Sequence, residues 1–292
     1  MAEPTRILPI SDIRLERRKL DDVPTPAPST FDVLVRAGDI WEGEPKKAVE
    51  SIVAFAQGRP AIIVPGNHDL YTSDYNDKRT ISDFTKLMQE EAERQNSRAR
   101  GDLVILLSSE DAVSEIDEVS FVGLTLWTDW SQAGRWRPDE PPEVMAARSR
   151  FLAGHWRDGA GEFRAINTER GAFTPYDFVA EHTSEKAILL DELAKVRGRA
   201  TIAITHHAPL ANVADVYREH RTPWWTPAFY CSDLLPNIHE SIRPDLWIFG
   251  HMHAPFDERH GRTRAVSNPV EGNRFDPNLV IEVPTANKST EP

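Results

Sequence analysis

The stretch AIIVPGNHD, residues 61–69, carries the strongest indication of the fold. Its first four residues form a short apolar run rich in Ile, and Pro65 and Gly66 end it, which predicts a buried strand. Three polar side chains follow at once, those of Asn67, His68 and Asp69. Ligands of open α/β sheets bind beyond the carboxyl ends of the strands, so this order of residues predicts a functional rim on such a sheet.

Four more apolar runs end in polar residues in the same way. The runs are 7–10, 31–36, 201–205 and 246–249. The residues that follow them are Ser11-Asp12, Gly38-Asp39, His206-His207 and Gly250-His251-Met252-His253. Residues that directly follow strands of one sheet can converge on its rim, so we expect Asp12, Asp39, Asn67, His206 and His251 to lie close together.

The side chains expected at this rim suit transition metals. They are two carboxylates, one carboxamide oxygen and three imidazoles, the third being that of His253. The set favours Mn, Fe, Co, Ni or Zn, because it is too rich in nitrogen for a dedicated Mg or Ca site and lacks the thiolates of a structural zinc site. The set also contains more ligands than one ion needs. Two ions about 3.5–4 Å apart, bridged by a carboxylate for which we choose Asp39, would activate a water for phosphoryl transfer.

Each signature also has a purely structural explanation. Gly followed by Asp or Asn after a strand is often a turn, because Gly tolerates positive φ and Asp or Asn bonds its own backbone. The pair His251 and His253 is more specific, since side chains two apart in an extended segment face the same way. The occurrence of all the signatures after successive strands favours one shared site over coincidence.

The signatures, in their order along the chain, resemble the calcineurin-like metallophosphoesterases. That family has Asp-x-His, Gly-Asp, Gly-Asn-His-Asp/Glu, a lone His and Gly-His-x-His. This chain has Asp12-Ile13-Arg14, Gly38-Asp39, Gly66-Asn67-His68-Asp69, His206 and Gly250-His251-Met252-His253, so the match extends from about residue 7 to about residue 270. The resemblance implies an α/β fold: a four-layer αββα sandwich of two mixed β-sheets flanked by helices, with a helical insertion near the metal site.

The resemblance implies two divalent metal ions, of Mn, Fe, Zn, Co or Ni, that share one ligand. The implied sets are Asp12, Asp39 and His253 for one metal, and Asp39, Asn67, His206 and His251 for the other.

His68 would be the catalytic histidine by the same resemblance. It would contact the phosphate or protonate the leaving oxygen, because a general acid must lie within hydrogen-bond reach of the leaving group. Asp69 would orient the His68 ring. The alternative for His68 is an ordinary turn histidine. Tyr71 could reach the phosphate but is more readily explained as a core tyrosine, and the role of His207 stays open.

One position departs from the family pattern, because Arg14 stands where the family has the His of Asp-x-His. A guanidinium is always protonated and has no lone pair, so Arg14 cannot ligate a metal, which weakens or empties the first site. Three explanations stay open. Arg14 pairs with Asp12 and clamps the substrate phosphate; it swings away from a weak site completed by water; or the chain has kept the fold and lost catalysis. We favour the first, which makes Arg14 a substrate-binding residue, because every other signature is complete.

Composition restricts the partners. The chain has 34 Lys and Arg against 46 Asp and Glu, a net charge of −12, and its basic residues are dispersed. A long nucleic acid requires a basic stripe, so nucleic acid is an unlikely partner and a nuclease is disfavoured. A small phosphorylated substrate fits, because bound metals would supply positive potential locally.

We expect a cytoplasmic protein without a membrane partner. Cys231 is the only cysteine of the sequence and cannot form an internal disulfide, which is compatible with a reducing compartment. Residues 1–6 lead directly into the first apolar run without the pattern of a signal peptide. No stretch approaches eighteen apolar residues.

We expect one domain over residues 1–284, followed by a polar, flexible tail at 285–292. Residues 45–57 read as a crossover helix, a capping box at Thr80 to Asp83 begins the next helix, and Thr174 begins a long helix that Gly198 ends. Residues 96–101 read as a loop. Residues 103–107 and 119–126 read as strands of the second sheet.

Residues 127–175 read as an inserted, cap-like segment. Trp127, Trp130, Trp136 and Trp156 alternate there with Arg135, Arg137, Arg148, Arg150 and Arg157. Either the tryptophans pack a helical subdomain with solvated arginines, which we prefer, or the segment covers the metal site and selects the leaving group of the substrate.

The sequence therefore predicts an enzyme, a phosphatase or phosphodiesterase that hydrolyses a phosphomonoester or phosphodiester by a metal-bound hydroxide. The alternative is a non-catalytic or single-metal member of the fold that acts as a binding protein, because Arg14 replaces a metal-ligand His.

Overall fold

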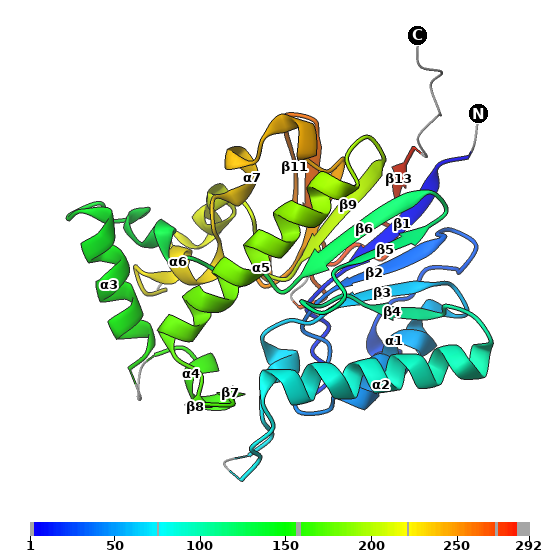
Figure 1. The fold of residues 1–292 in the computed structure, drawn as a ribbon, viewed down its shortest axis with the longest axis horizontal. Coiled ribbons are helices and arrows are strands. Elements are labelled where there is room, and N and C mark those ends of the chain that lie inside the picture. Colours follow the sequence, from blue (N-terminus) through cyan, green and yellow to red (C-terminus); the bar gives the residue numbers. More distant parts are fainter. Residues whose placement is uncertain (1–2, 75, 156–158, 221, 272–273, 285–292) are drawn as a thin grey trace.

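Two β-sheets packed face to face form the centre of the computed structural model, which describes residues 3–74, 76–155, 159–220, 222–271 and 274–284 (Figure 1). The first sheet has the strand order β13-β1-β2-β3-β4, and the second has the order β11-β12-β10-β9-β6-β5. The strands of the first sheet are β1 (Thr5–Ile10), β2 (Val33–Ala37), β3 (Ala61–Val64), β4 (Val104–Leu106) and β13 (Ile281–Val283). Those of the second are β5 (Val113–Ile116), β6 (Val119–Leu124), β9 (Ala200–Thr205), β10 (Leu246–Phe249), β11 (Phe256–His260) and β12 (Thr263–Ser267).

Both sheets are mixed, as predicted. Strands β1 to β4 are parallel, and β13 pairs antiparallel with β1 at one edge. Strands β6, β9, β10 and β12 are parallel, while β5 and β11 pair antiparallel at the edges. Ser11, directly after β1, forms a parallel bridge with Pro269, which follows β12. The carboxyl ends of the parallel strands of both sheets therefore meet at one rim.

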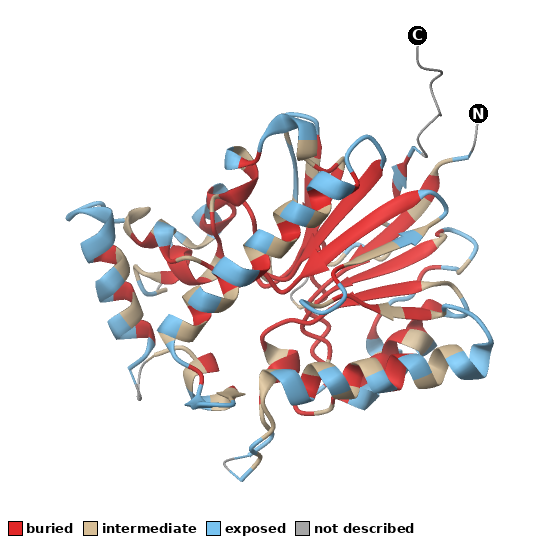
Figure 2. Ribbon diagram, in the orientation of Figure 1, coloured by how far each residue is buried: buried red, intermediate tan, exposed pale blue. Residues whose placement is uncertain are grey.

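Helices cover the outer face of each sheet and complete the four layers (Figures 1 and 2). Helices α1 (Pro45–Ala56) and α2 (Ile81–Ala99) contribute Ile52 and Met88 to a core with the first sheet. Helix α5 (Pro175–Lys195) contributes Leu189 and Leu193 to a core with the second sheet. A third core, which includes Val35 and Ile204, lies between the sheets. Every residue of β2, β6, β9 and β10 is buried, which accounts for their continuous apolar runs.

Capping boxes begin the two long helices, as the sequence predicts. Thr80 accepts a hydrogen bond from the Asp83 amide at 3.3 Å, and the Asp83 carboxylate accepts one from the Thr80 amide at 2.9 Å. Thr174 and Asp177 make the same reciprocal pair before α5. Each box satisfies two backbone groups that a helix end otherwise leaves unpaired.

Two expectations about the segment after α2 are wrong. Residues 96–99 continue the helix and are not a loop, because α2 ends only at Ala99 and Arg100 caps it with φ of 57°. The Asn96 side chain donates to the Val104 carbonyl at 2.8 Å and accepts from the Val104 amide at 2.8 Å. These bonds bring β4 to the edge of the first sheet beside β3, whereas we expected residues 103–107 in the second.

The inserted segment contains short helices and a small two-stranded sheet. Trp127 and Trp130 are buried in an aromatic core with Phe173 and Phe178, which agrees with the packing explanation for the tryptophans. Trp156, Arg157 and the tail at 285–292 lie outside the described residues. The elements of the segment are α3 (Pro142–Ala153), α4 (Glu162–Ala165), β7 (Asn167–Thr168) and β8 (Gly171–Ala172).

The remaining elements are short. Helices α6 (Thr226–Tyr230) and α7 (Leu234–Asn237) follow β9, and 3₁₀ turns occur at Leu20–Asp22, His68–Leu70, Ser131–Gly134, Ala211–Tyr217 and Glu240–Ile242. Within the described parts of the chain, none of the helices combines the length and the apolar character needed to cross a membrane.

Candidate metal centre

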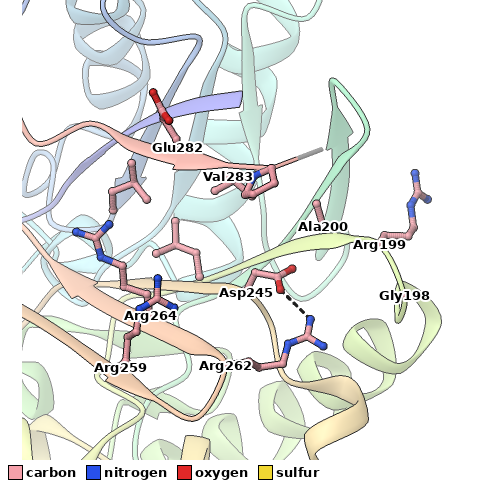
Figure 3. Close-up of a pocket in the computed structure, with 12 residues that line it drawn as sticks. Gly198, Arg199, Ala200, Asp245, Arg259, Arg262, Arg264, Glu282 and Val283 are labelled. Atoms are coloured by element: carbon pink, nitrogen blue, oxygen red, sulfur yellow. Dashed lines mark hydrogen bonds and ion pairs between the residues drawn. The ribbon is translucent and has the colours of Figure 1, made fainter. Parts of the chain in front are cut away.

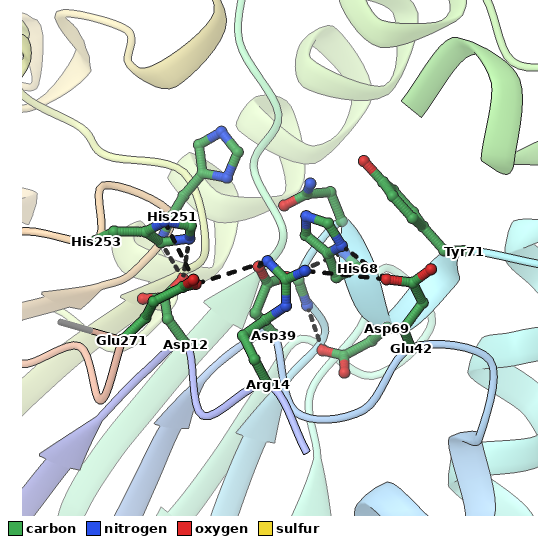
Figure 4. Close-up of polar contacts among 12 residues, drawn as sticks. Asp12, Arg14, Asp39, Glu42, His68, Asp69, Tyr71, His251, His253 and Glu271 are labelled. Carbon is green, nitrogen blue, oxygen red and sulfur yellow. Dashed lines mark hydrogen bonds and ion pairs between the residues drawn. The ribbon is translucent and has the colours of Figure 1, made fainter. Parts of the chain in front are cut away.

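The rim residues predicted from the sequence lie together at the carboxyl ends of the strands (Figure 4). Asp12 follows β1, Asp39 follows β2, Asn67 follows β3, His206 follows β9 and His251 follows β10. All five are buried, with at most 4% of their surface exposed. Polar side chains this deeply buried require partners, so the contacts of each one are informative.

The backbone at the rim adopts left-handed conformations that are unusual for these residue types. The φ angles are 53° at Asp12, 52° at Arg14, 56° at Asp39, 66° at His251 and 47° at His253. Each such residue costs about 1–2 kcal/mol relative to a right-handed conformation. Strain of this kind collects at functional sites, where the surrounding structure holds it in place.

Two glycines allow the rim residues to approach each other. A Cβ atom at Gly38 would lie 2.3 Å from Nδ1 of His206, and one at Gly66 would lie 2.3 Å from Oδ1 of Asp39. Any larger residue would therefore push the histidine and the carboxylate apart. The glycines of these signatures serve the site directly and not only the turns.

Asp12, Asp39 and His253 form a group whose ligand atoms all lie within 4.8 Å of one another. Nε2 of His253 lies 3.5 Å from Oδ1 of Asp12. Oδ2 of Asp12 and Oδ2 of Asp39 are buried without a hydrogen-bond partner. Burial and the charges of Asp12 and Asp69 raise the pKa of Asp39 well above its usual range. A cation between these carboxylates would offset their mutual repulsion and would give the two unpaired oxygens a partner. The group therefore fits a metal ion.

In a second group, several hydrogen-bond acceptors lie around the His206 ring. Nδ1 of His206 lies 2.8 Å from the Ala37 carbonyl, which can only accept, so Nδ1 carries the proton and Nε2 carries a lone pair. Burial lowers the pKa of His206, which keeps the ring neutral. Nε2 nevertheless lies 2.8 Å from Oδ1 of Asn67 and 3.3 Å from Oδ1 of Asp39, both acceptors. These acceptors repel one another unless a cation lies among them.

His251 completes this second group. Its ring centre lies 5.0 Å from that of His206, and its Nε2 is buried without a hydrogen-bond partner. Its backbone N–H donates to Oδ1 of Asp12 at 3.1 Å, which ties the His251 turn to the other group. Burial and the neighbouring His207 lower the pKa of His251 well below its usual range, so the ring keeps a lone pair for a metal.

His68 lies beside both groups. Its backbone N–H donates to Oδ1 of Asp39 at 3.0 Å, and Nδ1 of its ring lies 3.3 Å from Oε2 of Glu42. The ring packs against Tyr71 with centroids 4.2 Å apart. Burial and the cation of Arg14 lower the pKa of His68 to about 2. The ring is therefore neutral, and it can offer an N–H as a hydrogen-bond donor.

The expectation that Asp69 orients the His68 ring is wrong. Oδ1 of Asp69 accepts from the backbone N–H groups of Ile40 at 2.7 Å and Trp41 at 3.0 Å, and Oδ2 accepts from that of Gly66 at 2.8 Å. The carboxylate thus joins the loop after β2 to the loop after β3. Glu42 occupies the place beside the ring that we assigned to Asp69.

The Arg14 side chain stays in the site, with 2% of its surface exposed, and does not swing away. Its Nε donates to Glu16 at 2.5 Å, and its Nη1 lies 3.8 Å from Oδ2 of Asp39 and 3.8 Å from Glu271. Its Nη2 lies 3.9 Å from Glu42 and has no hydrogen-bond partner. The expected partner was Asp12, but the ion pairs of Arg14 are with these four other carboxylates. Figure 4 labels three of them, Asp39, Glu42 and Glu271.

Sequence reasoning missed the acidic residues around the site. Glu271 lies 3.5 Å from Nδ1 of His253, and Glu162 of the inserted segment accepts a hydrogen bond from Asn67 at 2.5 Å. Glu42 has a weak signal, since it lies three residues after Asp39. Glu162 and Glu271 have none, because they are remote from every signature in the sequence.

His207, whose role the sequence left open, lies beside His251 of the second group. Its Nδ1 lies 3.3 Å from the Thr125 carbonyl, and its ring contacts that of His251 with centroids 4.2 Å apart. Burial lowers the pKa of His207 well below its usual range. His207 therefore serves as a packing wall behind His251.

A separate cleft of about 500 Å³ lies at the opposite ends of the strands (Figure 3). It is lined by Ala200 and Leu246, with which β9 and β10 begin, and by four arginines. Of these, Arg262 donates to Asp245 at 2.9 Å and Arg264 donates to Asp257 at 2.6 Å. The cleft is remote from the metal groups and its charges are largely paired.

Comparisons with known proteins agree with this geometry. A protein-family model described as calcineurin-like phosphoesterase matches residues 10–255. The chain is 24% identical over 229 residues to uncharacterized protein L509 of Acanthamoeba polyphaga mimivirus, covering 75% of this chain and 72% of that protein. The crystal structure of the phosphopantetheinyl hydrolase PptH from Mycobacterium tuberculosis is similar with a TM-score of 0.66 and 19% identity, over 92% of this chain and 90% of that one. At that identity the likeness shows the fold alone.

Proposed function

Because the chain belongs to the calcineurin-like phosphoesterase family, we propose that it hydrolyses a phosphomonoester or phosphodiester with the help of divalent transition-metal ions at this rim. The observation that carries the proposal is the convergence of acceptors on Nε2 of His206. Asn67 and Asp39 each direct an oxygen at this lone pair, at 2.8 and 3.3 Å. A metal cation among these atoms would relieve that arrangement.

Two ligand sets follow from the contacts. We assign Asp12, Asp39 and His253 to one metal and Asp39, Asn67, His206 and His251 to the other. Mn, Fe, Zn, Co and Ni suit this mixture of carboxylate, amide and imidazole ligands. When bound, such ions supply an activated water and neutralise the charge of the phosphoryl oxygens.

His68 would contact the substrate through Nε2 of its ring. Its ring is neutral and 18% exposed, and Glu42 holds its Nδ1 at 3.3 Å. Because the Glu42 carboxylate only accepts, Nδ1 of the neutral ring carries the proton and Nε2 keeps a lone pair. The backbone N–H of His68 donates to Oδ1 of Asp39 at 3.0 Å, so the residue lies next to the proposed metal ligands. We assign His68 the contact with the leaving or phosphoryl oxygen.

Arg14 would bind the substrate phosphate. Glu16 anchors its Nε at 2.5 Å, whereas Nη2 is buried without a hydrogen-bond partner. A guanidinium that is fixed through Nε and has a donor without a hydrogen bond is suited to a phosphate oxygen. The same cation lies 3.8 Å from Asp39 and weakens the first metal site. We therefore expect the second metal to bind more tightly.

The alternative is a single-metal or non-catalytic member of the fold that binds a phosphorylated ligand. The guanidinium of Arg14 beside Asp39 is the observation that favours it. The net charge of −12 argues against long nucleic acids in either case, so we propose a small phosphorylated partner.

Metal content and turnover should be measured together on metal-free protein titrated with Mn, Zn, Fe, Co or Ni. The substrates are p-nitrophenyl phosphate and bis-p-nitrophenyl phosphate, and His68→Ala is the control. Metal-dependent turnover that His68→Ala lowers would support the proposal and distinguish monoester from diester. Metal binding without turnover on either substrate would favour the binding protein, and absence of metal binding would overturn the assignment of the ligands.

A further inference from the structure

Helix α4 joins the inserted segment to the loop that carries Asn67 and His68. The Thr72 backbone N–H donates to the Ala165 carbonyl at 2.8 Å, and the Thr72 hydroxyl donates to the same carbonyl at 2.8 Å. Ala165 ends α4, and Glu162 begins it. The helix therefore contacts this loop at both of its ends.

The Glu162 carboxylate reaches into the metal centre from this helix. Glu162 is 3% exposed, and its Oε1 accepts hydrogen bonds from Nδ2 of Asn67 and from the hydroxyl of Tyr71, both at 2.5 Å. A Cβ atom at Gly161 would lie 2.9 Å from the Tyr71 hydroxyl, so the glycine leaves room for this contact. Two donors thus meet one oxygen of a fully enclosed carboxylate.

This contact fixes which atom of Asn67 faces the metals. A carboxamide has nearly the same shape after a half-turn, but the two orientations exchange an acceptor for a donor. Oε1 of Glu162 already accepts from the Tyr71 hydroxyl and holds the NH₂ group of Asn67, which leaves Oδ1 of Asn67 directed at His206 Nε2, 2.8 Å away. In the opposite orientation Asn67 would present N–H groups to the metal and could not ligate it.

We propose that Glu162 is a positioning residue that orients Asn67 for metal binding, so that the inserted segment sets the metal affinity of the second site. The inference rests on the proposed function, because it assigns Asn67 to a metal. It also gives α4 a role other than contact with substrate. Partners that orient a ligand typically change metal affinity by about 10–100-fold when they are removed.

The test measures metal affinity directly, by calorimetric titration of metal-free protein with Mn or Zn. Glu162→Leu removes the acceptor, so we expect the dissociation constant of the tighter site to rise by about 10–100-fold. Glu162→Gln keeps an amide oxygen for both donors, so its dissociation constant should stay within about threefold of the wild-type value. Glu185→Leu is the matched control, because Glu185 is also a buried carboxylate but accepts from the backbone N–H of Leu126.

A second pair of variants keeps the test decisive if Glu162→Leu does not fold. In Asn67→Asp, two carboxylates would face each other where the donor and acceptor now lie 2.5 Å apart, so metal affinity should fall. Adding Glu162→Gln restores a donor opposite Asp, and the double variant should bind metal at least about fivefold more tightly than Asn67→Asp alone.

The outcomes separate the inference from the proposed function. The inference would be supported if Glu162→Leu binds metal more weakly than the wild type while Glu162→Gln does not. It would also be supported if the double variant regains the metal affinity that Asn67→Asp loses. The inference alone would be overturned if the wild type binds metal and Glu162→Leu binds it equally tightly. It would also be overturned if Glu162→Leu and Glu185→Leu lose the same amount of metal affinity. A wild-type protein that binds no divalent metal would count against both.

Discussion

The guanidinium of Arg14 lies with Nη1 3.8 Å from Oδ2 of Asp39, the carboxylate that both proposed metal sets share. Three glutamates, Glu16, Glu42 and Glu271, surround the same guanidinium within 4.0 Å. A fixed cation therefore lies next to the position where a metal would share Asp39. In the proposed assignment, this contact distinguishes the first metal site from the second.

Replacing Arg14 with His should strengthen the first metal site. The change removes the repelling charge and adds an imidazole at the position that the family uses for a ligand. We expect the number of ions per chain, measured by elemental analysis after dialysis at limiting metal, to rise toward two. The control is Arg17→His, since Arg17 pairs with the same Glu16 and Glu271 but is 56% exposed. An unchanged number of ions in Arg14→His would mean that Arg14 does not limit this site.

Replacing His68 with Ala should lower kcat by about 10²–10⁴-fold while metal affinity changes little. His68 lies beside the metal groups but is not among the proposed ligands, and the loss would concern only the contact with substrate oxygen. Calorimetric titration of the same variant with Mn measures the metal affinity. A loss of metal binding as large as the loss of kcat would instead make His68 part of the metal site.

The neutral His68 ring also predicts the shape of the pH profile. Burial and Arg14 lower its pKa to about 2, so protonation of His68 should not limit kcat between about pH 5 and pH 8. The profile is measured at saturating metal for the wild type and for His68→Gln. An acid limb near pH 6.5 that is present in the wild type and absent from His68→Gln would contradict this expectation.

Replacing Asp69 with Asn should destabilise the protein by about 1.5–3 kcal/mol, the contribution of one hydrogen bond to a charged group. Asp69 accepts from three backbone N–H groups in two loops, and an amide NH₂ cannot accept from one of them. Urea unfolding of metal-free protein measures the free energy of unfolding. Asp83→Asn, at the exposed capping box of α2, is the comparison and should cost about 1 kcal/mol or less. Equal effects of the two substitutions would show that Asp69 does not join the loops.

Replacing Glu185 with Gln should remove a loss of stability between about pH 4.5 and pH 8. Burial raises the pKa of Glu185 from 4.5 to about 8, although its carboxylate accepts from the Leu126 N–H and the Ser109 hydroxyl. The folded state therefore binds more protons than the unfolded state between these pH values. The stability that Glu185 contributes is fully present below about pH 4.5 and is lost as the pH rises through 8, by up to about 1.4 kcal/mol per pH unit.

Thermal unfolding of metal-free protein at several pH values measures this effect. The Tm difference between Glu185→Gln and the wild type should grow in favour of the variant from pH 5 to pH 8. A constant Tm difference over that range would show that Glu185 has an ordinary pKa in the folded protein.

Much of the fold was predictable because its signals are local. β3 and β10 have the predicted bounds, since buried strands read as short apolar runs that Gly, Pro or polar residues end. The convergence of Asp12, Asp39, Asn67 and His206 was predictable too, because parallel strands direct their carboxyl ends to one rim. The error at residues 96–99 arose because the polar stretch from Asn96 to Gly101 reads as a loop, whereas the Asn96 bonds to Val104 form only after the chain has turned back.

By itself, then, the sequence determined the layered α/β fold, the family and the set of residues at the rim, because each depends on periodicity and on motifs a few residues long. Only the tertiary structure decided which charges surround them. Asn67 and Glu162 are 95 residues apart, and Asp69 turned out to bind backbone amides, while Glu42 lies beside His68. Hydrogen bonds and ion pairs of this kind depend on distances between atoms that meet only when the sheets and the inserted segment pack, and no local pattern in the chain encodes those distances.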